Sequence, residues 1–255
     1  MSDDAFHARL KRGDLLTGCF CKIPSMQNIE VLGGSPLDCL VLDAEHGPFD
    51  RASLDQALMV LRAVGKPAIV RPQAATPEHI LSALDSGADA LLLPHIRNGR
   101  EAADAARWTR FGPGGRGFAG HTRSADLGRR PLPLHFQRAT EAACAIAQIE
   151  DAEALDHLDE IAGTPGIDAL FIGRIDLTIS LGLLDPKAPE VLAACNHICA
   201  AAKRAGKPVG LFTPDLTELP HWRSLGASLF LLGSDQGFLQ QGAARLATDV
   251  TAALQ

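Results

Sequence analysis

The chain has 255 residues, 46% of them hydrophobic, with a formal net charge of −6 and a pI near 5.8. This length is near the roughly 250 residues of a typical α/β barrel, and the acidic balance argues against a nucleic-acid-binding protein, which needs clustered Lys and Arg. No apolar run approaches the ~18 residues of a membrane span, and the charged N-terminus lacks the apolar stretch of a signal peptide. We therefore expect a cytoplasmic protein without membrane or nucleic-acid partners.

The six cysteines show neither the paired spacing of a zinc site nor that of a disulfide framework. Most lie in strand-like or Ala-rich segments, where a free cysteine behaves as a small hydrophobic residue. Cys195 and Cys199, one helical turn apart, are the one pair spaced to hold a metal, and plain burial is the favoured interpretation. We expect a reduced chain.

Eight short apolar segments have the character of strands, and helical patterns lie between them. The segments are continuously apolar rather than alternating, which is typical of strands covered on both faces. The predicted strands are 17–22, 39–45, Ala68–Arg71, Ala90–Leu93, 145–150, 169–173, 209–213 and 228–233. The predicted helices are Arg51–Val64, Pro77–Ser86, 101–110, 152–162, 189–205 and 216–225.

Local signals mark several helix ends. Gly65, Gly87 and Gly226 each stand where a helix would end before the next strand, a position that favours positive φ. Thr76 followed by Pro77 fits a helix N-cap and its first residue. The repeated alternation of strand and helix predicts an α/β fold of the (β/α)8 TIM-barrel type. A doubly wound open sheet is the rival, but it usually has a Gly-rich turn after the first strand, which is missing here. Nothing divides the chain, so we predict one barrel domain over residues 1–255.

Polar side chains gather where the predicted strands end, at the rim on which TIM barrels carry their chemistry. Glu150 and Asp176, on neighbouring strands, suit a hard divalent cation such as Mg²⁺ or Mn²⁺, which takes few protein ligands. Zinc would require more His or Cys. His95 and His121 lie at or near this rim as candidate substrate contacts. The Gly-rich loop 111–128 has a length typical of functional loops. The strand-end set is Lys22, Asp43, Glu45, His46, Arg71, Gln148, Glu150 and Asp176.

Four motifs at these positions resemble the HpcH/HpaI family of class II pyruvate aldolases. They are DAEHGP from Asp43, VRP from Val70, QIE from Gln148 and FIGRIDLTISLG from Phe171. The resemblance runs over nearly the whole chain and implies a (β/α)8 barrel that assembles as a homo-oligomer, a hexamer with a swapped terminal helix. It further implies reversible cleavage of 4-hydroxy-2-oxo acids to pyruvate and an aldehyde, with Mg²⁺, Mn²⁺ or Co²⁺ and no organic cofactor.

The resemblance also implies which residues bind the metal and pyruvate. Glu150 and Asp176 would ligate the metal, and Gln148 would hold a metal-bound water. Arg71 would lie against the ketone oxygen of pyruvate. Backbone amides near Ile175 and Asp176 would bind the pyruvate carboxylate, as suits a helix N-terminus.

The remaining implied roles concern proton transfer and further contacts. His46 would act as the base, since a histidine with an ordinary pKa near 6.5 accepts protons at neutral pH. Asp85 would be its partner, and Asp43 and Glu45 would support the network. Leu211 is a further predicted substrate contact.

The chain departs from the family pattern in two places. Residues 173–178 read GRIDLT where the family usually has GPADLS, so Arg174 replaces a proline beside the predicted metal ligand. The loop 121–128 also differs from the more frequent family forms, which leaves the aldehyde half unassigned. Arg123 or Arg174 would favour an acceptor with a distal negative charge, unless either is a solvated surface cation.

Three alternatives remain open. A Schiff-base lysine would also stabilise a carbanion, and Lys22 and Lys66 are its candidates. A lyase acting on a CoA thioester, of the citryl-CoA or malyl-CoA type, would use a basic patch, for which Arg123, Arg129 and Arg130 are available. A non-catalytic metabolite-binding barrel is the third.

Overall fold

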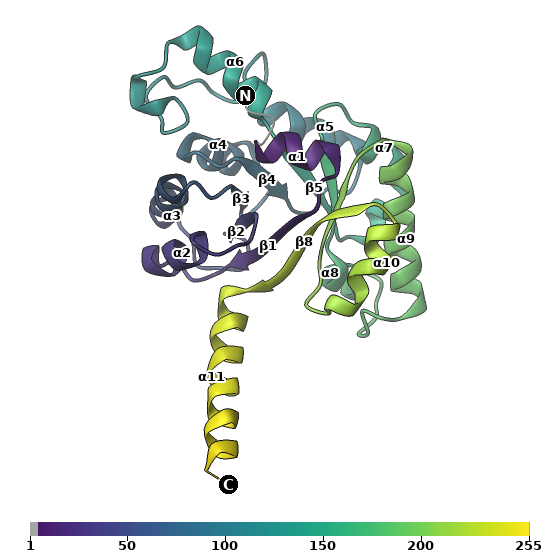
Figure 1. Cartoon of the computed structure of the whole chain (residues 1–255). Coiled ribbons are helices and arrows are strands. Elements are labelled where there is room, and N and C mark those ends of the chain that lie inside the picture. Colours follow the sequence, from purple (N-terminus) through teal and green to yellow (C-terminus); the bar gives the residue numbers. More distant parts are fainter. Residues whose placement is uncertain (1–4, 255) are drawn as a thin grey trace.

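Eight parallel strands close into a barrel (Figure 1), in a computed structural model that describes residues 5–254. Each strand pairs with the next along the chain and β8 pairs with β1. The (β/α)8 prediction is therefore confirmed, and the predicted strand limits differ from the observed ones by no more than two residues. The strands are β1 (Leu16–Cys21), β2 (Cys39–Asp43), β3 (Ala68–Arg71), β4 (Ala90–Leu93), β5 (Ala145–Ile149), β6 (Ala169–Ile172), β7 (Val209–Phe212) and β8 (Ala227–Ser234).

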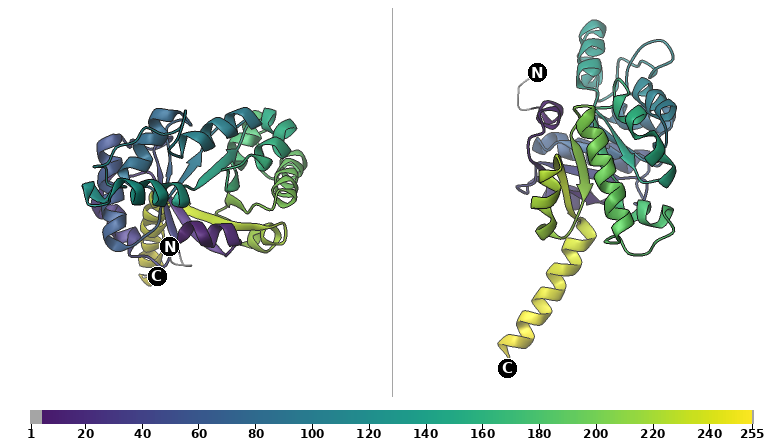
Figure 2. Two further views of the ribbon diagram at one scale, coloured as in Figure 1. Left: turned by 90° about the horizontal axis from the view of Figure 1, so that it is seen from above. Right: turned by 90° about the vertical axis from the view of Figure 1, so that its right-hand side faces the viewer.

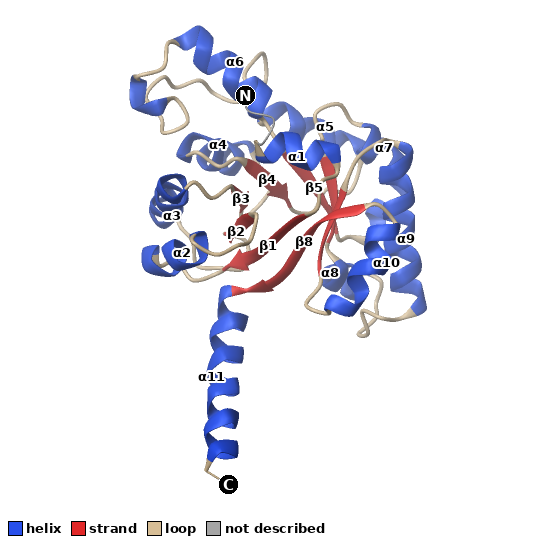
Figure 3. Ribbon diagram, viewed as in Figure 1, coloured by secondary structure: helices blue, strands red, loops and turns tan. Residues whose placement is uncertain are grey.

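Helices surround this barrel (Figures 2 and 3). The α-helices are α1 (Phe6–Arg12), α2 (Met26–Gly33), α3 (Arg51–Val64), α4 (Pro77–Ser86), α5 (Gly99–Trp108), α6 (Leu132–Ala142), α7 (Leu158–Gly163), α8 (Arg174–Ser180), α9 (Pro189–Arg204), α10 (Leu219–Ser224) and α11 (Asp235–Ala253). Three short 3₁₀ helices, η1 (Asp126–Gly128), η2 (Ala152–His157) and η3 (Leu216–Glu218), complete the set within the described residues.

The limits of α3 and α4 follow from local chemistry. Asp50 forms a capping box with Ser53 at the start of α3, and the Thr76 hydroxyl accepts from a backbone amide in the first turn of α4. Each cap supplies an acceptor for an amide that has no partner within the helix. Gly65 and Gly87 end these helices in the left-handed conformation, as expected.

The alternation of side chains along each strand divides the core into two layers. Val41 and Phe171 point inward and belong to the cluster that fills the barrel, which α1 closes at the bottom. Leu42 and Ile172, one residue further along, belong to the larger cluster between barrel and helices. The same alternation decides which residues can reach the mouth of the barrel.

The segment between α5 and β5 lies at the face where the strands begin. Arg62, in the last turn of α3, donates to Asp126 at 2.7 Å, and the Ser124 amide donates to the carbonyl of Asp85 at 3.2 Å. Helix α6, within this segment, lies on the opposite side of the barrel from α11 (Figures 1 and 2). The prediction that His121 and the loop 121–128 lie near the active rim is therefore not met within one chain. A segment that follows a helix and precedes a strand belongs to the other face.

Helix α11 leaves the end of β8 and extends away from the barrel (Figures 1 and 2). Beyond its first residue the helix has no buried side chain, and apolar residues such as Leu239, Leu246 and Val250 are exposed. No helix in the described residues is both long and apolar enough to cross a membrane.

All six cysteines are free and buried. Burial raises the pKa of Cys195 to about 12 and that of Cys199 to about 11. A cysteine binds a metal only as the thiolate, and these raised pKa values disfavour that form. Both thiols are therefore core residues, in line with the favoured interpretation.

Candidate active site

An ion pair between Arg71 and Asp43 forms the floor of the mouth. Arg71 Nε and Nη2 donate to the two oxygens of Asp43 at 2.9 and 2.7 Å, because the two residues are register partners at the ends of β3 and β2. Burial alone would raise the pKa of Asp43, but the hydrogen bonds and charge of Arg71 outweigh it and lower that pKa. The guanidinium lies 4.7 Å from the ring centroid of Phe20. Two hydrogen bonds and a ring contact fix its plane.

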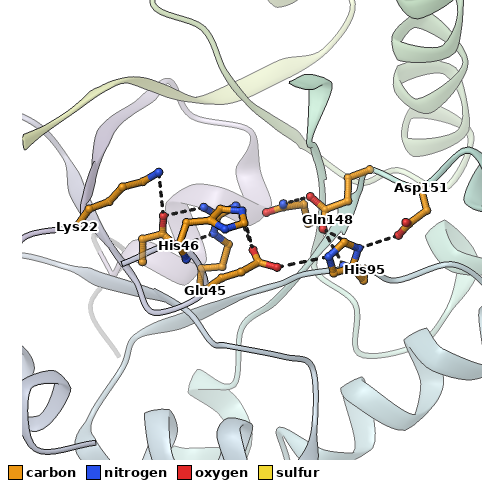
Figure 4. Close-up of polar contacts among 9 residues, drawn as sticks. Lys22, Glu45, His46, His95, Gln148 and Asp151 are labelled. Carbon is orange, nitrogen blue, oxygen red and sulfur yellow. Dashed lines mark hydrogen bonds and ion pairs between the residues drawn. The ribbon is translucent and has the colours of Figure 1, made fainter. Parts of the chain in front are cut away.

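His46 lies beside this pair, half-exposed to the mouth (Figure 4). Its amide donates to Asp43 at 3.2 Å, and its Nε2 lies 3.7 Å from Glu45 Oε2. Burial, followed by the charge of Arg71, lowers the pKa of His46. The neutral imidazole that a general base needs is therefore favoured near pH 7.

Glu45 is a partly buried carboxyl group whose pKa lies near neutral pH. Its side chain is 10% exposed, and burial raises its pKa to about 7, with Arg71 opposing and Glu150 adding to the effect. Its Oε2 lies 3.3 Å from Arg71 Nη1.

Glu150 follows directly after β5 and is almost fully buried. Burial raises its pKa, and the nearby charge of Asp176 adds to that rise. The amide of Gln148 donates to one oxygen, whereas Gln148 Oε1 is buried without a hydrogen-bond partner among the described residues. Gly173 leaves room here, because a Cβ at that position would lie 2.8 Å from Glu150 Oε2.

His95, expected only as a candidate substrate contact, lies against three carboxylates of the site. Its amide donates to Glu150 Oε1 at 2.9 Å, its Nδ1 lies 3.0 Å from Asp151 Oδ2, and its Nε2 lies 3.4 Å from Glu45 Oε1 (Figure 4). Burial opposes ionisation, but the hydrogen bond with Asp151 and the charges of Glu150, Asp151 and Glu45 outweigh it and raise the pKa of His95. Asp151 was missed, although it directly follows the predicted ligand Glu150.

The donor atoms in this region fit a divalent cation. One ligand atom each of Glu45, His95 and Glu150 lie within 4.8 Å of one another. Asp176 lies near enough to Glu150 to influence its ionisation. Carboxylate oxygens with an accessible neighbouring position are what Mg²⁺ and Mn²⁺ require.

A cavity of about 280 Å³ opens beside these groups. Asp176 and Ile175, in the first turn of α8, lie at its edge as predicted, together with Gln148 and Arg71. Its full lining is Phe20, Lys22, His46, Arg71, Gln148, Phe171, Ile172, Gly173, Arg174, Ile175, Asp176, Phe212 and Ser234.

Leu211 does not line this cavity. It is fully buried in the cluster between barrel and helices, and its neighbour Phe212 faces the cavity instead. The two side chains leave β7 on opposite sides, so the predicted contact is displaced by one residue.

Asp85 does not reach His46 within the described chain. It lies in the last turn of α4, where burial raises its pKa and the opposing cations are Arg116 and Arg51. Its Oδ1 is buried and has no hydrogen-bond partner among the described residues. The end of a helix that follows a strand points to the face opposite the mouth.

The candidate cations have partners that limit their roles. Lys22 Nζ lies 3.5 Å from Asp43, and Lys66 Nζ donates to the carbonyls of Ser35 and Leu37, away from the cavity. Arg174 lines the cavity but donates to Glu218 at 2.9 Å. In the suggested basic patch, Arg123 pairs with Asp55, Arg129 with Asp126, and Arg130 donates to the Ser124 carbonyl.

Comparisons with known proteins identify the family of the chain. The chain matches the HpcH/HpaI aldolase/citrate lyase family over residues 16–241. It is 34% identical over 244 residues to a 5-keto-4-deoxy-D-glucarate aldolase of Klebsiella pneumoniae, covering 95% of this chain and 94% of that protein. It is also 34% identical over 244 residues to a pyruvate aldolase of Rhizobium etli, covering 95% of each. The crystal structure of a family protein from Burkholderia cenocepacia gives a TM-score of 0.92 at 34% identity, covering 97% of this chain and 99% of that chain.

Proposed function

We propose, from the premise that this chain belongs to the HpcH/HpaI aldolase/citrate lyase family and is an aldolase, that it reversibly cleaves 4-hydroxy-2-oxo acids to pyruvate and an aldehyde. One observation carries the proposal. The Arg71–Asp43 pair, His46 and Gln148 meet at one cavity, with Glu150 directly behind Gln148 and Gly173.

Glu150 and Asp176 would hold a divalent cation, which when bound supplies Lewis acidity toward the carboxylate and ketone of the 2-oxo acid. Mg²⁺, Mn²⁺ and Co²⁺ are the candidates. The unpaired Oε1 of Gln148 supports its predicted role of accepting from an ordered water in the cavity. The amides of Ile175 and Asp176 would bind the pyruvate carboxylate.

Arg71 provides positive charge where negative charge develops on the ketone oxygen. Its guanidinium is already held by Asp43 and Phe20, so little reorganisation is needed during the reaction. His46 would take the proton of the C4 hydroxyl, directly or through water, and return it in the aldol direction.

Asp85 can serve as the partner of His46 only if it comes from a second copy of the chain, because the two are not in contact within one copy. An oligomer is supported independently by α11, whose apolar residues Leu239, Leu246 and Val250 stay exposed among the described residues. We therefore propose a homo-oligomer, a hexamer by resemblance, in which α11 packs on a neighbour. Six free cysteines support a reducing compartment such as the cytoplasm.

Few residues are positioned to bind the aldehyde, which is the acceptor in the aldol direction. Arg174 is paired with Glu218, and Arg123 lies against Asp55 at the other face. We propose relaxed aldehyde specificity, with a modest preference for hydroxylated or carboxylated acceptors. A panel of aldehydes with pyruvate under one metal checks this, and turnover confined to one aldehyde would contradict it.

The CoA-thioester alternative has little support, because the arginines it requires already have partners. Borohydride trapping with pyruvate tests the Schiff-base alternative. Metal binding measured together with pyruvate release tests the non-catalytic alternative.

The test of the proposed function compares the chelator-treated protein with Glu150→Gln and Asp176→Asn. We expect metal to restore pyruvate release to the wild type, and both variants to bind metal more weakly and lose turnover while their circular dichroism is unchanged, because hard cations prefer anionic oxygen. Unaltered activity of either variant after chelation would refute the metal assignment. A protein that binds metal but never releases pyruvate would instead be the metabolite-binding barrel.

A further inference from the structure

The backbone of His95 is held in an unusual conformation. Its φ is +55°, and only Asp126 and Leu127 share a positive φ among the described residues other than glycine. Such a conformation is costly for a residue with a Cβ, and it persists where surrounding contacts impose it. Here it directs the His95 amide onto Glu150 Oε1 at 2.9 Å. The strained turn therefore places the ring of His95 beside Glu150.

The ring is fixed by a carboxylate on one side. Nδ1 lies 3.0 Å from Asp151 Oδ2, and a hydrogen bond donated by Nδ1 to this carboxylate would leave the Nε2 lone pair for a cation. Histidines that ligate metals nearly always donate their second ring N–H to a carboxylate or carbonyl in this way.

The free nitrogen faces a second carboxylate. Nε2 lies 3.4 Å from Glu45 Oε1 (Figure 4), whereas Glu45 Oε2 has its own ion pair with Arg71 Nη1 at 3.3 Å. Two lone pairs at this distance repel one another unless positive charge lies between them. A proton or a metal ion would supply that charge, and the carboxylate of Glu150 is close enough to complete a metal site.

We propose that His95 is a ligand, through Nε2, of the cation held by Glu150, with Glu45 as a further ligand and Asp151 orienting the ring. The inference rests on the metal dependence proposed above. Affinity for a site that includes a nitrogen ligand rises along the first-row divalent metals from Mn²⁺ to Co²⁺, whereas Mg²⁺ is suited by oxygen ligands. The site therefore selects a transition metal, and His95 is the residue that sets the preference.

Electron spin echo measurements of protein loaded with Mn²⁺ alone test the ligand directly, because they detect a directly bound histidine nitrogen. We expect a nitrogen signal in the wild type that is lost in His95→Asn. Asparagine tolerates positive φ and keeps the backbone amide that contacts Glu150, so this variant removes the ring and leaves the turn. His157→Asn is the matched control, since His157 also has a carboxylate near Nδ1, 3.5 Å away on Glu160, and lies outside the site.

Metal titrations by calorimetry give the second readout. His95→Asn should weaken Mn²⁺ and Co²⁺ binding by at least about 10- to 100-fold, since removing only the partner that orients a ligand already has an effect of that size, and it should change Mg²⁺ binding far less. Asp151→Asn should also weaken Mn²⁺ binding. It should retain the nitrogen signal, because the proposal makes Asp151 the residue that orients the His95 ring and not a ligand.

Wild-type protein that binds Mn²⁺ without a nitrogen signal would show that a proton fills the gap, and the inference would fail while the proposed function stood. Equal losses of Mg²⁺ and Mn²⁺ affinity in His95→Asn would also overturn it. Wild-type protein that binds no divalent cation would remove the proposed metal dependence itself.

Discussion

Replacing Glu45 by glutamine should stabilise the metal-free protein at alkaline pH. Burial raises the pKa of Glu45 to about 7 from the ordinary 4.5. The folded state therefore binds this proton more tightly than the unfolded state, and the advantage, fully present below pH 4.5, is lost as the pH rises through 7. At 1.36 kcal/mol per pH unit, the difference corresponds to about 3 kcal/mol of destabilisation above pH 8.

The assay is thermal or urea unfolding of chelated wild type and Glu45→Gln at pH 5 and pH 8. Between these two values we expect the variant to gain roughly 2 kcal/mol on the wild type, because most of the Glu45 titration falls in this range. For a chain of this size that is a change of about 4–8 °C in the difference between the two melting temperatures. Glu153→Gln, which removes an exposed carboxylate from η2, controls for net charge.

An equal stability difference between Glu45→Gln and the wild type at both pH values would refute this reasoning. It would mean that Arg71 and His95 hold the carboxylate ionised throughout the range. Adding Mn²⁺ should abolish the advantage of the variant, since a bound cation compensates the buried charge.

Three further changes test the remaining chemistry. Arg71→Ala should lower kcat about 100-fold or more. Arg71→Lys should recover little, because an ammonium does not reproduce the rigid planar fork that pairs with Asp43; full rescue by lysine would exclude a role for the guanidinium plane. Gly173→Ala should weaken Mn²⁺ binding in a calorimetric titration, because its Cβ would lie 2.8 Å from Glu150 Oε2, and unchanged affinity would show that Glu150 is not a ligand. Borohydride with pyruvate should leave no reduced adduct on Lys22 by mass spectrometry, whereas a trapped adduct would establish the Schiff-base route.

The fold could be predicted from the sequence because its signals are local. Continuous apolar runs marked all eight strands, Gly65 and Gly87 marked the ends of α3 and α4, and Thr76 with Pro77 marked the start of α4. No residue range was predicted for α1, α2, α6, α8 or α11, although the resemblance implied a terminal helix and a helix N-terminus near Asp176. For α11, the weak apolar periodicity of a helix without a core-facing stripe explains the omission.

The candidate site was predictable only in part. Residues that end strands pointing inward, such as Arg71 and Glu150, followed from topology and resemblance. The prediction for Leu211 missed the cavity by one residue, because neighbouring side chains in a strand point to opposite faces. Asp85 was predicted as the partner of His46 from the resemblance alone. It lies at the end of α4, and barrel topology places the ends of these helices at the face opposite the mouth. The role of His95 could not be predicted, because its partners Glu45 and Glu150 come from two other strands and meet it only in space.

The proposed packing of α11 on a neighbouring copy would tie the stability of this protein to its concentration. The apolar side chains exposed along α11 would become buried only when copies of the chain associate. The unfolding equilibrium would then depend on protein concentration through mass action. Dilution should then lower the melting temperature, and each tenfold dilution should cost about 1.4 kcal/mol per mole of complex for every molecule beyond the first. The amount of protein in a sample is then as much a determinant of the folded population as temperature or pH.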